Sequence, residues 1–290
     1  MLFSLLLGAT ALCQTPETAG AQLVGRKFLY TVERGDSLAR IGARFGVDPG
    51  LLARSNGLSS RARLSVGQSL QVKNRHIIPF VLDEGILINV PQRLLFFFQG
   101  GRLAAWYPVG LGRSDWKTVT GRFEVATKER KPTWNVPVSI QEEMRRHGEP
   151  VRTEVPPGPA NPLGDYWIGL SGSLCGIHGT NAPASIYGFR THGCIRLHPD
   201  DIADLFSRVS IATPVWIAYE PVLLALREDG ALFLEVNPDV YGRAGSARAA
   251  VDALAARMGL LSLLDAARVD QVIANREGIA RRVGPPTAER

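Results

Sequence analysis

The chain has 290 residues, of which 45% are hydrophobic and 21% are charged. These values are ordinary for a globular protein, so they exclude a disordered or collagen-like chain, and the length predicts two or three domains. Lys and Arg outnumber Asp and Glu by 33 to 27, and the net charge of +6 favours an anionic partner. The basic residues are scattered, without a run or an aromatic stripe beside them, which argues against nucleic acid as that partner.

The beginning of the chain is similar to a secretory signal peptide. An apolar stretch too short to span a bilayer is followed by small residues in the Ala-x-Ala pattern, at Ala9 and Ala11 and again at Ala19 and Ala21. No Lys or Arg precedes the apolar stretch, so a misplaced start codon and a buried N-terminus are alternatives. We expect residues 1–21 to be a signal peptide and the protein to be exported.

Residues 28–73 predict the order strand, helix, helix, strand. Asp36 or Ser37 can cap a first helix and Asp48 a second, and Gly67 precedes a closing strand. The pattern resembles a LysM domain on the following residues: Tyr30-Thr31-Val32, Gly35-Asp36-Ser37-Leu38, Ile41, Phe45-Gly46, Leu52, Asn56, Leu64 and Gly67-Gln68-Ser69-Leu70. The resemblance implies binding of glycans that contain N-acetylglucosamine. The alternative is a βααβ unit that only packs on its neighbour.

A β-rich stretch follows. Runs of β-branched and aromatic residues predict strands at 86–90, 94–98, 103–107, 122–128, 166–170, 174–178 and 215–219. The proline-rich segment 131–164 is incompatible with regular sheet over most of its length, so it predicts a long excursion over the surface. Excursions of this kind are typical of a lid, a binding loop or a disordered segment.

The character of the chain changes after Pro221. Segments 223–225 and 231–236 predict a hairpin about Asp229-Gly230, and helical periodicity begins at Ser246. We therefore expect residues 221–290 to form a C-terminal region, a hairpin and then helices, whose role is packing. The whole chain is predicted to be an α+β protein.

One short region carries the residues suited to chemistry. Cys194 lies among three of the five histidines, which are His178, His192 and His198. An imidazole can lower the pKa of a thiol, so His178 and Cys194 can act as base and nucleophile if their segments are neighbours. Gly193 allows close approach of backbone N–H groups to a substrate carbonyl, and Arg196 suits a substrate carboxylate.

Other interpretations of these residues were weighed against catalysis. Cys175 stands at an odd spacing from His178, so on a regular strand it points to the opposite face and is predicted to be a core thiol. A zinc site lacks the usual Cys-x-x-Cys or His-Glu-x-x-His spacing, and a satisfied polar core would not need so many glycines. A Cys-His hydrolase that uses water as acceptor stays open.

The region also resembles a known family. Residues 78–220 are similar to the catalytic domain of the YkuD-type L,D-transpeptidases, through His178-Gly179-Thr180-Asn181 and the run from Gly188 to Leu197. Further segments resemble the branch that carries a LysM domain and attaches an outer-membrane lipoprotein to peptidoglycan: Lys131 to Trp134, Asn161 to Gly164 and Pro199 to Phe206. Thr191 stands where serine is commoner, and Arg196 where many members have asparagine.

The resemblance implies a β-sandwich-like catalytic domain and a role for each matching residue. Cys194 would attack the bond between diaminopimelate and the terminal D-alanine of a donor stem peptide, with His178 as general base. The implied substrate-binding residues are Gly179, Thr180, Asn181, Arg190, His192, Gly193 and Arg196. Neither a metal nor an organic cofactor is implied.

The implied partner is peptidoglycan, with stem peptides at the catalytic domain and glycan strands at the LysM domain. The acyl acceptor stays open among a second stem, which gives 3-3 crosslinks, a lipoprotein lysine, and water, which would make the protein an L,D-carboxypeptidase. A non-catalytic peptidoglycan-binding protein is the alternative from a different class. The expected location is the periplasm, in association with the cell wall.

Overall fold

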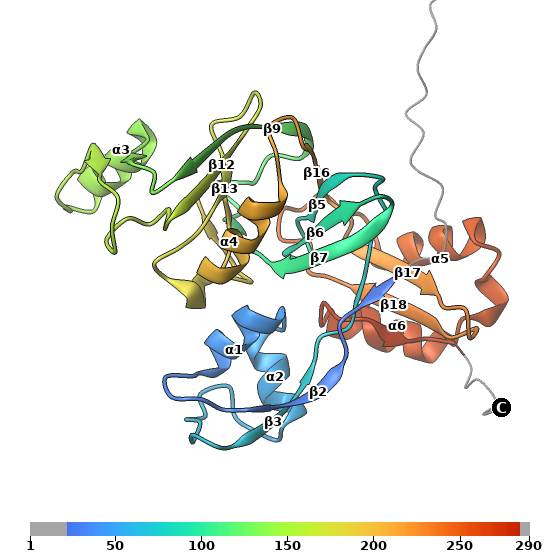
Figure 1. Ribbon diagram of the computed structural model, residues 1–290. Coiled ribbons are helices and arrows are strands. Elements are labelled where there is room, and N and C mark those ends of the chain that lie inside the picture. Colours follow the sequence, from blue (N-terminus) through green and yellow to red (C-terminus); the bar gives the residue numbers. More distant parts are fainter. Residues whose placement is uncertain (1–21, 285–290) are drawn as a thin grey trace, which may run out of the picture.

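The computed structural model describes residues 22–284, so the predicted signal peptide, residues 1–21, lies outside the described part of the chain. The larger helices and strands are arranged as in Figure 1. The helices are α1 Leu38–Phe45, α2 Pro49–Ser55, α3 Val138–Arg146, α4 Pro199–Arg208, α5 Ala247–Arg257 and α6 Ala266–Asn275, with 3-10 turns η1 Pro183–Ser185 and η2 Leu261–Leu263. The strands are β1 Leu23–Val24, β2 Lys27–Thr31, β3 Ser69–Lys73, β4 His76–Ile77, β5 Gly85–Asn89, β6 Leu94–Gln99, β7 Arg102–Pro108, β8 Leu111–Gly112, β9 Gly121–Arg130, β10 Trp134–Asn135, β11 Glu154–Val155, β12 Tyr166–Leu170, β13 Gly176–His178, β14 Phe189–Thr191, β15 Ile195–Arg196, β16 Pro214–Ala218, β17 Val222–Leu226, β18 Leu232–Val236 and β19 Arg281–Arg282.

The N-terminal unit has the predicted βααβ order, with β2 and β3 paired antiparallel around α1 and α2. Both helices begin at capping side chains, because Ser37 Oγ accepts the N–H of Arg40 and Asp48 Oδ1 accepts that of Leu51. Asn56 ties the end of α2 to β3, since its amide donates to the carbonyl of Gln71 at 3.0 Å and its oxygen accepts the N–H of Gln71 at 2.7 Å. Capping and this amide bridge therefore fix the unit around an apolar core, which Ile279 of the C-terminal region also enters.

An eight-stranded sheet forms the centre of the molecule, in the order β15-β13-β12-β9-β16-β5-β6-β7. The ten-residue strand β9 belongs to both halves of this sheet: it pairs with β16 through residues 121–124 and with β12 through residues 125–130. The sheet curls around an apolar core, on which the buried residues Ile202, Leu205 and Phe206 of α4 pack. The other face of β5 and β6 packs into a second apolar cluster. The sandwich-like expectation is thus met by one continuous sheet, and the predicted α+β fold class is confirmed.

The C-terminal region packs beside this sheet as a separate layer. The hairpin β17–β18 is extended by β19, and α5 and α6 cover it with a core of its own. Figure 1 shows these elements on the side opposite to α3. Residues 237–245 return from this layer to the eight-stranded sheet, and Tyr241 is buried in the core of that sheet.

A fully buried polar cluster joins the three parts of the chain. The Glu235 carboxylate in β18 accepts hydrogen bonds from the backbone N–H of Ile77 at 2.7 Å and the Gln92 amide at 2.9 Å, and it pairs with the His76 ring at 3.2 Å. The other nitrogen of that ring contacts the carbonyl of Gly46, in the N-terminal unit, at 3.0 Å. Each group in the cluster is satisfied by a group from another part of the chain, so the parts are joined by directional bonds.

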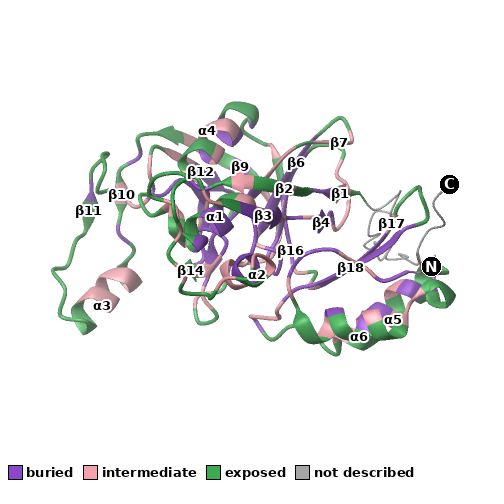
Figure 2. Ribbon diagram, turned by 90° about the horizontal axis from the view of Figure 1, so that it is seen from below, coloured by how far each residue is buried: buried purple, intermediate pink, exposed green. Residues whose placement is uncertain are grey.

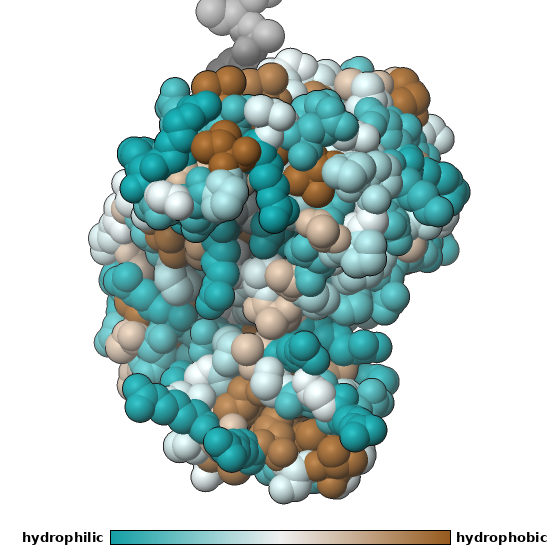
Figure 3. Space-filling view, turned by 90° about the vertical axis from the view of Figure 1, so that its left-hand side faces the viewer, coloured by the Kyte–Doolittle hydropathy of each residue, from teal (hydrophilic) through white to brown (hydrophobic). Residues whose placement is uncertain are grey.

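The segment 131–164 leaves the body of the molecule, as predicted, but it has regular structure that the sequence did not indicate. It contains α3 and a short antiparallel ladder between β10 and β11. Figure 2 shows that α3 carries no buried residue, and this explains why hydrophobic periodicity did not predict it. Seen from the side on which α3 lies, the upper part of the surface is mostly hydrophilic, and hydrophobic residues gather at the lower part, which the βααβ unit forms (Figure 3).

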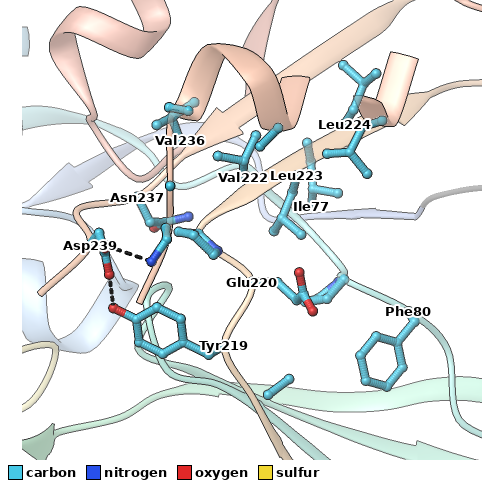
Figure 4. Close-up of a pocket in the computed structure, with 18 of the residues that line it drawn as sticks. Ile77, Phe80, Tyr219, Glu220, Val222, Leu223, Leu224, Val236, Asn237 and Asp239 are labelled. Carbon is cyan, nitrogen blue, oxygen red and sulfur yellow. Dashed lines mark hydrogen bonds between the residues drawn. The ribbon is translucent and has the colours of Figure 1, made fainter. Parts of the chain in front are cut away.

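A cavity of about 1420 Å³ lies between the central sheet and the C-terminal region. Figure 4 shows its lining, in which Tyr219 points toward Asp239 and the apolar side chains of Val222 and Leu224 come from β17. None of the predicted site residues lines this cavity. Within residues 22–284, the helices are all too short or too polar to cross a membrane.

Candidate active site

The predicted base and nucleophile lie on neighbouring strands at one edge of the sheet. Strands β13 and β15 are parallel, with Ile177 opposite Ile195 and His178 opposite Arg196. Cys194 comes directly before β15, two residues from Arg196, and side chains two residues apart share a face of an extended segment. The topology therefore brings His178, Arg196 and Cys194 to the same edge of the sheet.

His178 is buried, and its ring is held by backbone carbonyls. Its Nδ1 donates to the carbonyl of Gly179 at 2.7 Å, and the carbonyl of Leu163 also bonds to the ring. The Trp167 ring stacks on it, with centroids 5.9 Å apart and an interplanar angle of 24°. Burial, assisted by the positive charge of Arg196, lowers the pKa of His178 from 6.5 to about 3. The imidazole is consequently neutral at physiological pH, which is the form that can accept a proton.

Cys194 is half-buried, and some neighbours of its thiol disfavour the thiolate form while others favour it. The pKa of the thiol is raised well above its usual value, first by a hydrogen bond with the Cys175 thiol and then by burial. The backbone N–H of Gly176 and the charge of Arg196 act in the opposite direction and favour the thiolate. No hydrogen bond joins Cys194 to His178 in the described part of the chain.

The prediction that Cys175 is a core thiol is wrong. Strand β13 begins only at Gly176, so the alternation that would turn Cys175 to the opposite face does not apply to it. Cys175 is half-buried, its Sγ lies 4.0 Å from the carbonyl oxygen of His192, and interaction with Cys194 lowers the pKa of its thiol. The exposed turn before it, with Leu174 fully exposed, replaces the predicted start of the strand.

The backbone around Cys194 is fixed by two hydroxyl groups. Thr191 Oγ1 accepts the N–H of Gly193 at 3.2 Å and donates to the carbonyl of Cys194 at 2.6 Å. Thr118 Oγ1 donates to the carbonyl of Gly193 at 2.9 Å. Gly193 itself has φ +106, a conformation that side chains rarely adopt. Both peptide groups that flank the thiol are therefore held by side chains.

A tyrosine of the C-terminal region, Tyr241, holds Thr118 in place. The Tyr241 hydroxyl accepts the N–H of Thr118 at 3.0 Å and donates to the carbonyl of Gly112 at 2.8 Å, while the N–H of Gly112 donates to Thr118 Oγ1 at 2.9 Å. Sequence reasoning missed both side chains, because Thr118 and Tyr241 are more than 40 residues from Cys194 along the chain. The chain Tyr241–Thr118–Gly193 connects the C-terminal layer to the segment that carries the thiol.

Helix α3 approaches the same segment from the other side. Glu143 hydrogen-bonds to His192 Nε2, and its second carboxylate oxygen pairs with the Arg113 guanidinium at 3.1 Å. Hydrogen bonding to His192 is the main reason why the pKa of Glu143 is lowered, which keeps its carboxylate charged. The edge of the Trp116 ring meets the His192 ring with centroids 4.8 Å apart. The segment 131–164 is thus attached to the site through Glu143, a residue that the sequence analysis did not single out.

The guanidinium of Arg196 has one bonded nitrogen and one buried nitrogen without a partner among residues 22–284. Its Nη1 donates to Ser185 Oγ at 2.8 Å, whereas its buried Nε has no hydrogen-bond partner within the described residues. Ser185 belongs to η1, against which α1 of the N-terminal unit packs. The βααβ unit therefore lies close to the segment that positions Arg196.

The remaining predicted residues lie around this edge with different degrees of exposure. Gly179 and Thr180 are buried, and the Thr180 hydroxyl accepts the N–H of Ala182 at 2.9 Å, which shapes the turn after β13. Asn181 and Arg190 are exposed. Among residues 22–284 no group of three or more His, Cys, Asp or Glu side chains is placed to hold a metal ion.

Comparisons with known proteins identify the family of the chain. The profile of the YkuD L,D-transpeptidase catalytic domain matches residues 83–217, and the profile of the LysM domain matches residues 30–73. The chain belongs to the L,D-transpeptidase family, so the predicted enzyme class is confirmed, as is the resemblance to a LysM domain.

Individual relatives extend the similarity beyond the catalytic domain. "Probable L,D-transpeptidase YbiS" of Escherichia coli strain K12 is 31% identical over 284 residues, which cover 96% of this chain and 92% of that protein. "Probable L,D-transpeptidase ErfK/SrfK" of the same strain is 34% identical over 75% of this chain and 71% of its own. "Probable L,D-transpeptidase YcfS", also from that strain, is 32% identical over 76% of this chain and 70% of its own.

Proposed function

We propose that the protein is an exported, wall-associated peptidoglycan L,D-transpeptidase whose nucleophile is Cys194 and whose general base is His178. The observation that carries the proposal is the parallel pairing of β13 with β15, which puts a half-buried thiol at the same edge as a buried neutral imidazole. Two parts of the site favour the thiolate once the proton has left, namely the N–H of Gly176 and the charge of Arg196.

The proposed reaction has two steps. Cys194 Sγ attacks the carbonyl carbon between diaminopimelate and D-alanine while its proton passes to His178, a transfer whose hydrogen bond forms when substrate binds. The C–N bond breaks, the leaving amine of D-alanine takes the proton, and a thioester remains on Cys194. An acceptor amine then attacks the thioester carbonyl, which forms the new amide and returns the thiol.

Two further features suit this substrate. The N–H of Gly193 is engaged by Thr191, so we assign the stabilisation of the oxyanion to the N–H of Cys194. The positive charge of Arg196 suits a carboxylate of the stem peptide, and the exposed Arg190 and Asn181 can contact the rest of the stem. Gly179, Thr180 and His192 shape the walls of this region.

The LysM domain would hold a glycan strand beside the site. Its helix α1 packs on η1, whose Ser185 contacts Arg196, so bound glycan and thiol belong to adjoining surfaces. Tethering of this kind raises the effective concentration of stem peptides near the thiol. The net charge of +6 also suits an anionic polymer of the cell wall.

The test uses the full chain, kept reduced, with a disaccharide-tetrapeptide that contains diaminopimelate. Intact-mass spectrometry should show an acyl-enzyme on Cys194 and a dimer that lacks one D-alanine. Cys194→Ala should give neither product, whereas the neighbouring variant Cys175→Ala should retain the adduct. Turnover by Cys194→Ala would refute the assignment of the nucleophile.

The same assay identifies the acceptor. A lipoprotein peptide with a free lysine, added to the reaction, should be joined to the tripeptide stem if a protein amine is the acceptor. A tripeptide formed without any dimer or conjugate would establish hydrolysis by water, that is, an L,D-carboxypeptidase. An absence of any adduct, together with retention on wall material, would support a peptidoglycan-binding protein instead.

A further inference from the structure

The two described cysteines occupy adjoining positions at the edge of the sheet. The register of β13 and β15 sets Ile177 opposite Ile195, and continuing it by one residue sets Gly176 opposite Cys194. Cys175 therefore directly precedes Gly176, the residue that lies opposite Cys194. With strands about 4.8 Å apart and a rise of about 3.3 Å per residue, this offset corresponds to a Cα separation on the order of 6 Å. Disulfides bridge Cα atoms about 4.4–6.8 Å apart.

The Cys175 side chain contacts the segment that carries Cys194. Cys175 Sγ lies 4.0 Å from the carbonyl oxygen of His192, and interaction with the Cys175 thiol is the main reason why the pKa of Cys194 is raised. A Cβ atom placed on Gly193 would come within 3.2 Å of that same sulfur. The Cys175 sulfur therefore rests against three successive residues, 192 to 194, of the segment that carries the proposed nucleophile.

Access and mobility favour a reaction between these sulfurs. Neither cysteine residue is fully buried. Cys175 follows an exposed turn with glycine at 172 and the fully exposed Leu174, and it lies outside the hydrogen-bonded part of β13. This turn can adjust without disturbing the sheet, whereas Cys194 is held by Thr191.

We propose that Cys175 and Cys194 form a reversible disulfide that switches the transpeptidase off under oxidising conditions. The effect on catalysis rests on the proposed function, because it follows from the assignment of Cys194 as nucleophile. The formation of the bond does not depend on that assignment. Cys175 thereby gains a role that its position outside the core would otherwise leave unexplained.

The chemistry balances with a peroxide as oxidant and a dithiol as reductant. One thiolate attacks the peroxide, which gives a sulfenic acid and one water molecule, and the second thiol displaces the hydroxyl group as another water molecule. Two thiols and one hydrogen peroxide thus yield one disulfide and two water molecules. A dithiol returns both electrons by thiol–disulfide exchange and restores the two thiols.

Disulfide formation also protects the nucleophile from irreversible damage. A sulfenic acid without a nearby thiol proceeds to sulfinic and sulfonic acids, which thiols do not reduce. With Cys175 in contact, the sulfenic acid is consumed within the same molecule before a second peroxide arrives. We therefore expect inactivation by peroxide to be reversible, and the reversibility to depend on Cys175.

The test uses the full chain with the substitution Cys13→Ser, which leaves only the two thiols of interest, since the sequence has three cysteines. The reduced protein is treated with a small excess of hydrogen peroxide. Intact mass should fall by about 2 Da, as expected for loss of two hydrogens, and peptide mapping should recover a linked pair of peptides containing residues 175 and 194. Crosslinking activity should fall at least roughly tenfold and return after dithiothreitol.

The matched variant adds Cys175→Ala to the same background. Its mass should rise in steps of about 16 Da under peroxide, and dithiothreitol should not restore its activity. Cys175→Ser serves the same purpose if the alanine variant is poorly folded. Each variant is compared with its own reduced form, so differences in basal rate do not enter the result.

Two results would overturn the proposal. The first is a peroxide-treated parent protein that gains oxygen at Cys194 without any species lighter by about 2 Da. The second is equal recovery of activity by the parent and by Cys175→Ala. If the mapped disulfide forms but crosslinking continues unchanged, the disulfide is established and the assignment of Cys194 as nucleophile is refuted.

Discussion

The hydroxyl of Tyr241 is the point at which the C-terminal region acts on the site, and Tyr241→Phe removes it alone. The aromatic packing stays, because the ring contacts with Tyr219 and Phe189 do not involve the hydroxyl. What is lost is one acceptor for the N–H of Thr118 and one donor to the carbonyl of Gly112.

The expected cost follows from burial. Thr118 and Tyr241 are 1% and 4% exposed, so water cannot easily replace the missing group. An unsatisfied buried polar group costs about 1–3 kcal/mol, and two of them, of which the carbonyl keeps a second lone pair, give about 2–4 kcal/mol. We also expect kcat/KM for dimer formation to fall roughly tenfold, because Thr118 holds the carbonyl of Gly193 and a small displacement of the nucleophile is costly.

Urea unfolding followed by tryptophan fluorescence measures the first effect, and initial rates of dimer formation measure the second. Tyr166→Phe is the matched control, because no hydrogen bond of the Tyr166 hydroxyl is found within residues 22–284 while its ring packs on Phe206. The control should change stability by less than about 0.5 kcal/mol. A similarly small change for Tyr241→Phe would refute the argument from burial. A loss of stability with an unchanged rate would refute the positioning role.

Three further predictions concern other parts of the molecule. Glu143→Gln should weaken the attachment of α3 and speed trypsin cleavage after the exposed Arg145. Glu142 is an exposed neighbour in that helix, so Glu142→Gln should leave the cleavage rate unchanged. Equal cleavage rates in the two variants would contradict the attachment through Glu143. Because the folded-state pKa of His178 lies at about 3, below its unfolded value of 6.5, the unfolded chain binds a proton first as the pH falls. This group alone should remove about 2 kcal/mol of stability between about pH 7 and about pH 5, and urea unfolding of His178→Asn should show a correspondingly smaller loss over that interval. Glu235→Gln replaces an oxygen acceptor by an NH₂ donor within a buried set of donors, so urea unfolding should show a loss of about 2–4 kcal/mol, and a loss under about 0.5 kcal/mol would show that the cluster rearranges.

The features that could be predicted from sequence are those encoded locally. The βααβ unit follows from capping residues and turn glycines, and most strands of the catalytic sheet follow from β-branched and aromatic runs. The clustering of His178 and Cys194 was also visible, because only 15 residues separate them along the chain. A short sequence separation was enough to single out both residues as candidates.

The features that escaped prediction depend on long-range contacts or on a strand end. Helix α3 buries none of its residues, so hydrophobic periodicity could not reveal it. Glu143 and His192 are distant along the chain, and only the tertiary structure brings them into contact. Tyr241 belongs to a region that the sequence suggested was only for packing. Cys175 was misassigned because the alternation of side chains holds only inside a strand, and β13 begins one residue later.

The order of strands in the central sheet has a consequence for the sequence of folding events. Strand β16 fills the place between β5 and β9, with Val215 beside Ile86, so the two halves of the sheet cannot join until most of the chain is available. Parallel pairing over such a separation is slow to form. The βααβ unit, in contrast, closes within residues 27–73 and can fold while the rest is still unpaired. A nascent molecule would therefore possess its LysM domain well before the candidate active site is assembled.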